Sequence, residues 1–331
     1  MAKSNNIKGK AFEYAVLSCL KESLDEGGAN ATVDVSNAFK KARDSFEGMS
    51  ETAKADYISA AACGIEMIKL LEPCLNAQNE TFKLQIQADA RGQEGDVRDV
   101  VCIRGDAAWE IGFSCKHNHE ALKHPRVTND MDFGSDWVGV PCSSEFKRAV
   151  SAALAPVEEW AENGDSWCQH DDVHELVYLP IIQAFVSEIQ RLCDLDPSIP
   201  GKLLGYFFGI EDFYKIIAND RRSKGMPGAT KVMAFNLGGT LGTACGSVKS
   251  IRPVRRLKMP SKLFDIRIKD GTKTTLVMTF DENWVISMRL HNADKKVKRT
   301  GLKWDVQLKG MPSDMYQQEQ PWSCEYGVVK L

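Results

Sequence analysis

An aspartate and a lysine stand at opposite ends of a stretch with the pattern of a β-hairpin. Residues 99–104 and 109–116 each have the composition of a strand, and Gly105-Asp106 marks a turn between them. Asp99 opens the first strand and Lys116 closes the second, so a hairpin would bring the two side chains together. Metal-dependent phosphodiester hydrolysis needs carboxylates that hold Mg²⁺ and a lysine near the attacking water. Asp99 and Lys116 meet that need.

Neighbouring residues offer alternatives and supporting roles. Asp96 is a rival of Asp99 as the metal ligand, although Asp99 directly abuts the apolar run of the first strand. Arg98 faces away from Asp99 and is a candidate contact for backbone phosphate. Glu110 is separated from Lys116 by about 20 Å of strand, at 3.3 Å per residue. We therefore expect Glu110 to be structural.

The second strand continues into His117, Asn118 and His119, after which we expect a helix. The literal string HNH is treated as coincidence, because the nucleases named after those letters do not place them consecutively. His117 and Asn118 remain candidate DNA contacts. An exposed imidazole after a strand is at least as common as a functional one.

Helical and extended patterns alternate along the rest of the chain. They predict an α/β or α+β fold with a soft boundary near residue 219. We expect residues 1–218 to form a helical and catalytic region and residues 219–331 to form a β-rich, basic, DNA-contacting region. The predicted helices cover 8–24, 34–46, 50–72, 143–162, 173–193, 201–210 and 211–218, and the predicted strands cover 81–88, 99–104, 109–116, 263–280 (a hairpin around Asp270-Gly271), 284–292 and 302–310.

Charge is distributed unevenly over the 331 residues. The net charge is only −3, but residues 249–309 hold sixteen Lys or Arg and six Asp or Glu, a net of +10. Such asymmetry suggests that one lobe meets a polyanion. A β-domain with solvated basic faces explains the charge equally well.

The remaining composition is that of an ordinary globular protein. The hydrophobic content is 43% and the charged content 26%. We find no uncharged apolar window long enough to cross a membrane and no secretory signal at the N-terminus. The ten cysteines are scattered without a CxxC pair. A reduced cytoplasmic protein without a membrane segment is therefore expected.

The hairpin resembles the nuclease core written PD-(D/E)XK, in which an acidic residue, a spacer and a lysine end the second strand. Here that triplet is Ser114-Cys115-Lys116, so a serine stands at the usual acidic position. Nucleases with this core sometimes recruit a carboxylate from a helix instead. The resemblance implies Glu120 as the first choice for the third ligand, and Glu13 on the first helix as the second choice.

Longer strings resemble the HaeIII-type family of type II restriction endonucleases. They are GKAFEYAVL, GDVRDVV, SCKHNHEALKHPR and DFGSDW. The resemblance implies Mg²⁺-dependent cleavage of both strands of DNA at a short palindrome, with GGCC as the expected sequence. A palindromic target favours a homodimer, although a monomer that acts in two steps stays open.

Guanine-rich sites are read mainly by Arg or Lys donating to O6 and N7 in the major groove. The candidate DNA-binding residues are Arg221, Arg222, Lys224, Arg255 and Arg256. Phosphate contacts are the commoner role of such residues. Two other functions remain open: a DNA-binding regulator that uses the basic lobe without catalysis, and a cytosolic small-molecule enzyme. The chain lacks a phosphate-binding loop with its lysine and a GxSxG motif, which weakens the second.

Overall fold

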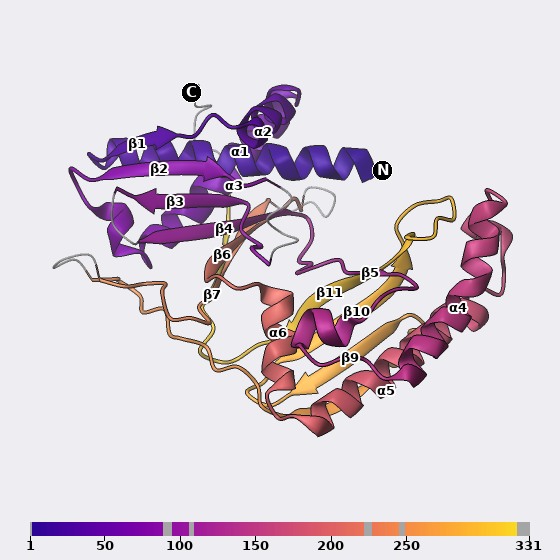
Figure 1. The fold of residues 1–331 in the computed structure, drawn as a ribbon. Coiled ribbons are helices and arrows are strands. Elements are labelled where there is room, and N and C mark those ends of the chain that lie inside the picture. Colours follow the sequence, from indigo (N-terminus) through magenta and orange to yellow (C-terminus); the bar gives the residue numbers. More distant parts are fainter. Residues whose placement is uncertain (1, 89–94, 106–108, 222–226, 245–248, 323–331) are drawn as a thin grey trace. The chain divides into compact units, whose positions relative to one another are not determined.

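The computed structural model describes residues 2–88, 95–105, 109–221, 227–244 and 249–322, with side chains from Asn6 onward. It divides into two compact units, each built from chain segments that are far apart in sequence (Figure 1). Unit 1 comprises residues 1–120, 209–257 and 314–331, and unit 2 comprises residues 121–208 and 258–313. Each unit is a mixture of helices and a β-sheet, which confirms the predicted α/β class.

Unit 1 contains a seven-stranded mixed sheet in the order β1-β2-β3-β4-β6-β7-β12. The pairs β1–β2 and β4–β6 are parallel, and the other neighbours are antiparallel. Its elements are α1 (Ala2–Glu26), β1 (Asn30–Val33), α2 (Asn37–Glu47), α3 (Glu51–Lys69), η1 (Pro73–Asn76), β2 (Thr81–Ile86), β3 (Val100–Arg104), β4 (Glu110–His117), β6 (Phe213–Asn219), β7 (Ala229–Phe235) and β12 (Gln317–Pro321).

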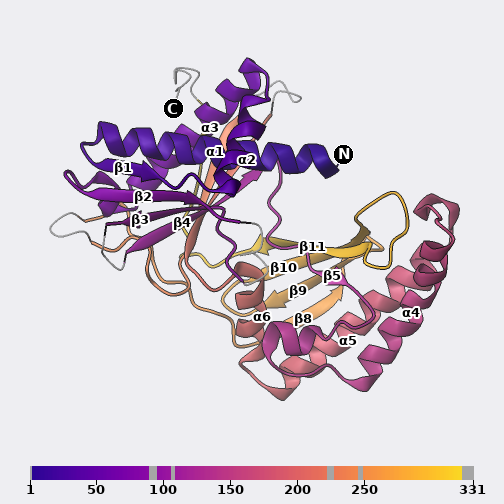
Figure 2. The same ribbon diagram turned by 45° about the horizontal axis from the view of Figure 1, so that its top comes forward.

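The helices α1 and α3 cover one face of this sheet (Figure 2). Alternate residues of β4, namely Ile111, Phe113 and Cys115, point into the core that these helices close. The intervening residues of β4, among them Ser114 and Lys116, therefore point to the opposite face. The parallel neighbour β6 continues this alternation, because Tyr214, Ile216 and Ala218 face the same core and Lys215 lies in register with Ser114 on the opposite face.

Unit 2 contains a five-stranded antiparallel sheet in the order β5-β11-β10-β9-β8. The helix α5 packs on β8 and β9, and α4 packs on α5. Its elements are β5 (Arg126–Val127), η3 (Gly134–Val138), α4 (Ser144–Glu162), η4 (Trp167–Gln169), η5 (His174–Tyr178), α5 (Leu179–Leu195), α6 (Ile199–Phe208), β8 (Leu263–Ile268), β9 (Thr275–Phe280), β10 (Val285–Asn292) and β11 (Leu302–Gly310).

The core of unit 2 is aromatic. The ring of Phe185 on α5 meets the ring of Trp304 on β11 edge-on, with centroids 4.9 Å apart, and stacks on Phe133 at 4.8 Å. Among the described residues, the segment His174–Leu195 is long and apolar enough by composition to cross a membrane, although it includes charged residues such as Glu175 and Glu188. Its apolar side chains include Phe185 in this packed core, as expected of a helix that belongs to a globular unit.

Most predicted elements are confirmed, and two are wrong. Residues 211–218 were expected to be helical, but they contain the strand β6. The run is short, apolar and buried on both sides of a central strand, a pattern that cannot be told from a buried helix by periodicity alone. The helix expected after the second strand is absent, because residues 118–125 have no helical turn. Asn118 has a positive φ of 57° and ends the strand, and Pro125 closes the segment.

The boundary expected near residue 219 does not coincide with either compact unit. Residues 213–235 add β6 and β7 to the N-terminal sheet, and β12 returns from near the C-terminus to pair with β7. Residues 258–313 instead form a unit with the helices of residues 144–208. Central strands need hydrogen-bonded partners on both edges. Strand pairing, and not the order of the segments along the chain, therefore decides which unit a segment joins.

Candidate active site

The backbone of Asp99 extends the ladder of the β3–β4 hairpin by one residue beyond β3. Its amide donates to the carbonyl of Phe113 at 2.8 Å, and its carbonyl accepts from the amide of Gln87 at 2.9 Å. The pair Val100–Phe113 fixes the register, which places Asp99 opposite Ser114. Asp99 therefore projects from the polar face of the sheet on a backbone that is held from both sides. The hairpin predicted from the sequence is confirmed.

One carboxylate oxygen of Asp99 collects three donors from the end of β4. Asp99 Oδ2 accepts from Lys116 Nζ at 3.1 Å, from the Cys115 amide at 2.7 Å and from Ser114 Oγ at 3.4 Å. Burial alone would lower the pKa of Lys116, but the charge and hydrogen bond of Asp99 outweigh it and raise that pKa. Lys116 is therefore a cation at neutral pH, fixed beside a carboxylate, as the hairpin geometry predicted.

Glu13 on α1 places a second carboxylate within electrostatic reach of Asp99. Its side chain is buried, and its Oε2 accepts from Lys10 Nζ at 2.9 Å. Burial, reinforced by the negative charge of Asp99, raises the pKa of Glu13 to about 8, although Lys10 and Lys116 pull it down. Two carboxylates that repel each other in a buried setting are an arrangement that a bound cation would relieve.

Glu120 takes a different place from the one expected. It lies in the irregular segment after β4, and its Oε1 accepts from Lys231 Nζ at 3.2 Å. Its backbone carbonyl accepts from Lys215 Nζ at 2.6 Å. No direct bond joins Glu120 to Asp99 or Lys116 in the described part of the chain. Glu120 therefore lies at the border of the cluster, whereas Glu13 is electrostatically linked to Asp99.

Lys215 is a residue of the cluster that sequence reasoning missed. It is paired in register with Ser114 across β4 and β6, so it projects from the same face as Lys116. Burial, with repulsion from Lys116, lowers the pKa of Lys215 to about 7. The signal in the sequence is a lysine in the middle of the apolar run FYKIIA. The prediction of a helix for that run gave no reason to place this lysine beside Lys116.

A second cluster lies on the same hairpin and is closed upon itself. Arg98 donates to both oxygens of Asp96, each at 2.8 Å, and to Glu110 at 2.7 Å. Burial works against ionisation of Asp96, but the bonds from Arg98 and Gln87 hold its pKa below the usual value. The carboxylate oxygens of Asp96 thus bond to Arg98 and Gln87 and not to Lys116, and the Arg98 side chain is buried. The structural role expected for Glu110 agrees with its bond to Arg98.

Gly112 explains how Arg98 fits. A Cβ atom at Gly112 would lie 1.9 Å from Cδ of Arg98, so the guanidinium arm crosses the strand where no side chain stands. The expectation that Arg98 reaches backbone phosphate does not match this buried position. Alternation predicted that Arg98 faces away from Asp99, but the residues before β3 leave the regular strand, and the Arg98 side chain crosses Gly112 on the face of β4 that also carries Ser114.

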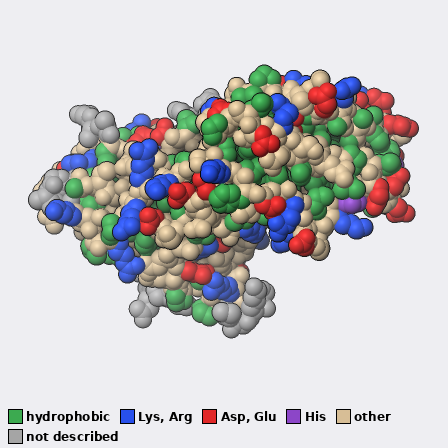
Figure 3. Space-filling view, turned by 90° about the horizontal axis from the view of Figure 1, so that it is seen from below, with side chains coloured by type: hydrophobic (Ala, Val, Ile, Leu, Met, Phe, Trp, Pro, Cys, Tyr) green, Lys and Arg blue, Asp and Glu red, His purple; other side chains and the backbone are tan. Residues whose placement is uncertain are grey.

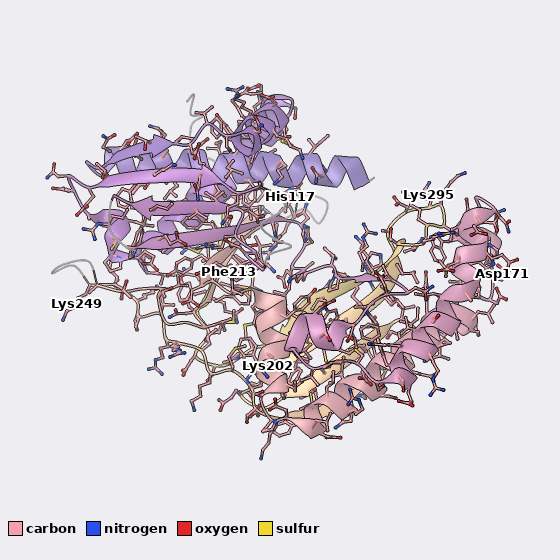
Figure 4. The ribbon with its side chains drawn as sticks, viewed as in Figure 1. His117, Asp171, Lys202, Phe213, Lys249 and Lys295 are labelled. Atoms are coloured by element: carbon pink, nitrogen blue, oxygen red, sulfur yellow. The ribbon has the colours of Figure 1, made fainter. Side chains whose placement is uncertain are left out.

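His117 ends β4 (Figure 4), and Asn118 follows it. Both line a cavity together with Lys8 and Gly9 of α1. The His117 ring packs against Tyr57 with centroids 4.9 Å apart. The backbone amide of Asn118 donates to the carbonyl of Ala218 at 2.8 Å, and the side-chain oxygen Oδ1 of Asn118 accepts from the backbone amide of Asp220 at 2.7 Å. These bonds hold the turn after β4 in place.

The candidate base-reading residues are dispersed. Arg221 pairs with Glu319, Arg255 pairs with Asp314 at 3.1 Å, and Arg256 donates to the carbonyl of Leu237 at 2.9 Å. Arg222 and Lys224 lie outside the described residues. On the face seen in Figure 3, Lys and Arg side chains alternate with Asp and Glu instead of forming one basic field. The geometry alone does not single out a base-reading residue.

A divalent cation suits the acidic pair of this site. Among the described residues, no group of three or more His, Cys, Asp or Glu side chains converges. Mg²⁺ does not need one, because it is commonly held by one or two carboxylates with waters and substrate phosphate as its other ligands. The oxygen donors of Asp99 and Glu13, which repel each other, fit such a cation.

Two comparisons identify relatives of the chain. Residues 9–312 match the family described as HaeIII restriction endonuclease. The curated protein "Type II restriction enzyme HaeIII" of Haemophilus aegyptius is 31% identical over 323 residues, which cover 97% of this chain and 99% of the relative. No solved structure matches the chain.

Proposed function

The chain belongs to the HaeIII restriction endonuclease family, a family of site-specific deoxyribonucleases, and from this premise we propose that it cleaves both strands of DNA at GGCC with Mg²⁺. The observation that carries the proposal is the contact between Asp99 and Lys116, with Glu13 beside it. A carboxylate pair next to a fixed lysine is what phosphodiester hydrolysis requires, and it occurs here in a family of nucleases.

Asp99 and Glu13 are the residues that would hold the cation. When bound, Mg²⁺ polarises the scissile phosphate and supplies charge that stabilises the developing oxyanion. The raised pKa of Glu13 supports this assignment, because a carboxylate that is costly to ionise alone becomes a good ligand for a cation. Glu13 is therefore preferred over Glu120, which reverses the order that the resemblance implied.

Lys116 is assigned to the attacking water and to the phosphate. Its ammonium is held 3.1 Å from Asp99 Oδ2 and carries a charge at neutral pH. From that position it orients a water by hydrogen bonding and stabilises the negative charge of the pentacovalent transition state. Ser114 stands where a PD-(D/E)XK core has its acid, and its hydroxyl lies 3.4 Å from Asp99. Ser114 thus orients Asp99, and Glu13 takes over the missing carboxylate.

Lys215 and Glu120 are assigned to a supporting role. Lys215 holds the carbonyl of Glu120 at 2.6 Å, and Lys231 holds its carboxylate at 3.2 Å. These two bonds fix the segment that leaves β4 directly after the catalytic lysine. Glu120 is thereby a positioning residue.

Recognition of the palindrome is assigned to basic residues of the region 219–331. Arg221, Arg255 and Arg256 are the described candidates, and their partners in the free protein are acidic or carbonyl oxygens. Exchange of those partners for guanine or phosphate on binding would cost little where the residues are exposed. A palindromic target also favours a homodimer, in which each copy cuts one strand.

Plasmid DNA tests the proposal. The protein is incubated with a plasmid of known sequence in Mg²⁺, without metal, and in Mg²⁺ with excess EDTA. Discrete fragments in Mg²⁺ alone are the expected result. A mobility shift without cutting in Mg²⁺ would favour the alternative, a non-catalytic DNA-binding regulator, and the absence of both would favour a small-molecule enzyme.

The recognition sequence is tested on the same digest. Run-off sequencing across each cut gives both the target and the position of cleavage. Every cut is expected within GGCC, and a plasmid fragment whose GGCC sites are mutated to GGAC serves as the matched control. Cuts at another palindrome would retain the nuclease and discard the sequence preference.

A further inference from the structure

A small polar cavity opens beside the catalytic strand. It has a volume of about 210 Å³ and is lined by Lys8 and Gly9 of α1 and by His117, Asn118 and His119 at the end of β4. A water molecule takes up about 30 Å³, so the cavity has room for a group of several heavy atoms. Every lining residue belongs to unit 1, and none is acidic.

Gly9 is out of place in the interior of a long helix. Glycine destabilises a helix by roughly 1 kcal/mol relative to alanine, and α1 runs from Ala2 to Glu26. A Cβ atom at Gly9 would meet nothing within 4 Å among the described atoms, so packing does not demand a glycine there. The missing side chain keeps the cavity open, which suggests that the space is used by something outside the chain.

The other walls of the cavity offer donors. Lys8 is exposed and contributes a mobile ammonium. Asn118 uses its side-chain oxygen to accept from the amide of Asp220, which leaves its Nδ2 hydrogens on the side of the His117 ring, 3.4 Å from Nε2. Ammonium, amide and imidazole groups, with no carboxylate among the residues that line the cavity, form a set that suits an oxyanion.

Two chain segments, α1 and β4, link the cavity to the proposed active site. Gly9 precedes Glu13 by one turn on the same side of α1, a rise of about 6 Å. His117 directly follows Lys116 on β4, so its side chain points to the face of the sheet that the helices cover, the side from which Glu13 comes. The cavity therefore adjoins the proposed site on the α1 side. Successive phosphates of a DNA strand are the anions that would occupy two such neighbouring positions.

We propose that the Gly9 cavity binds a backbone phosphate of the DNA strand, next to the phosphate that is cleaved. The proposal rests on the proposed function and adds a phosphate-binding subsite to it. The subsite fixes the strand relative to Lys116 and carries no sequence information. Gly9 is retained because a side chain would occupy the place of the phosphate.

Filling the cavity tests the proposal. Gly9→Ala and Gly9→Leu are compared with wild type in thermal unfolding and in binding of a GGCC duplex without metal. Both variants should unfold at or above the wild-type temperature, because both residues favour a helix. The affinity for DNA should fall, by about tenfold for Gly9→Leu.

Gly205→Ala is the matched control. Gly205 also lies inside a helix, α6, with nothing within 4 Å of its Cβ position, and it does not line the cavity. This variant should match Gly9→Ala in stability and bind DNA as wild type does. Equal loss of affinity in the two alanine variants, or wild-type affinity in a folded Gly9→Leu, would overturn the proposal.

Lys8→Gln provides a measurement that does not alter packing. Loss of one phosphate contact should lower the slope of log K against log salt by about one. An unchanged slope would argue against a phosphate in the cavity. Failure of the wild type to cut DNA would count against the proposed function alone, because these binding measurements contain no cleavage step.

Discussion

The β3–β4 hairpin carries two clusters of acids and bases that differ in how completely they are paired. At Arg98, the guanidinium meets Asp96 and Glu110, and each bond is 2.7 or 2.8 Å long. At Lys116, a single bond of 3.1 Å reaches Asp99, and a second buried carboxylate, Glu13, is held with its pKa raised to about 8. Both clusters include residues of the same hairpin, and both combine acidic with basic side chains.

The difference separates a structural ion pair from a site. The Arg98 cluster satisfies its charges internally, so a ligand would have to break strong bonds to enter. The Lys116 cluster keeps two carboxylates that repel each other, together with Lys215, whose pKa is lowered to about 7. Perturbed pKa values of this kind mark candidates for a functional site. Incomplete compensation is therefore the better guide to function than the mere presence of an acid and a base.

The largest effect is expected at the open cluster. Lys116→Ala should lower the cleavage rate by at least about 10³-fold, because the charge next to the transition state is lost. Folding and DNA binding should be nearly unchanged. Plasmid cleavage in Mg²⁺, circular dichroism and a mobility shift measure the three properties. Lys83→Ala is the control, since Lys83 is an exposed lysine of the same sheet paired with Asp34. Cleavage retained by Lys116→Ala would remove Lys116 from the mechanism.

The closed cluster should respond in stability. Arg98→Ala leaves Asp96 buried without its partner and should lower the free energy of unfolding by about 3–5 kcal/mol. Urea unfolding measures this change. Glu110→Gln, which alters the more exposed partner, should cost less than about 1 kcal/mol. Asp96→Asn should likewise destabilise the fold while the protein that remains folded keeps its metal requirement. A stable Asp96→Asn variant without cleavage would make Asp96 a ligand after all.

Substitutions of the two rival carboxylates, Glu13 and Glu120, should lower cleavage by less than Lys116→Ala does. Glu13→Gln should reduce kcat/KM on the order of 10²-fold and raise the Mg²⁺ concentration needed for half-maximal cleavage. Glu120→Gln should change kcat/KM less than tenfold, because Glu120 bonds to Lys231 and to no group of the central pair. Metal titrations of cleavage compare the two. A larger effect at Glu120 would restore it as the third ligand.

The smallest effect is a dependence of stability on pH. In the folded protein the pKa of Glu13 is about 8, above its usual 4.5, so between these values the folded state holds the proton that the unfolded state releases. Glu13 thus destabilises the metal-free fold progressively as the pH rises from 4.5 to 8, by up to a few kcal/mol at about 1.4 kcal/mol per pKa unit.

Urea unfolding in EDTA at pH 5.5 and 8.5 measures this dependence. Wild type should lose stability relative to Glu13→Gln as the pH rises. Lys215 is present in both proteins, so its opposite contribution cancels in the difference. Parallel stabilities at the two pH values would mean that Glu13 is already ionised in the fold.

The sequence by itself determined the hairpin and the meeting of Asp99 with Lys116. The alternation of side chains on either side of Gly105 predicted that Asp99 and Lys116 lie at the same end of two paired strands, because the position of the turn fixes the register of a hairpin. The same local rules predicted the hairpin around Gly271 and the helices α2, α3 and α4 to within a few residues, whereas α1 begins at Ala2 and not at the predicted residue 8. Local propensity and periodicity suffice where an element's partner is its neighbour along the chain.

Only the tertiary structure decided which other side chains reach that hairpin. Lys215 comes from a strand 99 residues after Lys116, and Glu13 comes from a helix that precedes it by about as much. The pairing of β4 with β6 and the packing of α1 on the sheet bring them there, and neither follows from local pattern. Burial then sets the pKa of both groups, because desolvation depends on the whole fold and not on the residues next in sequence.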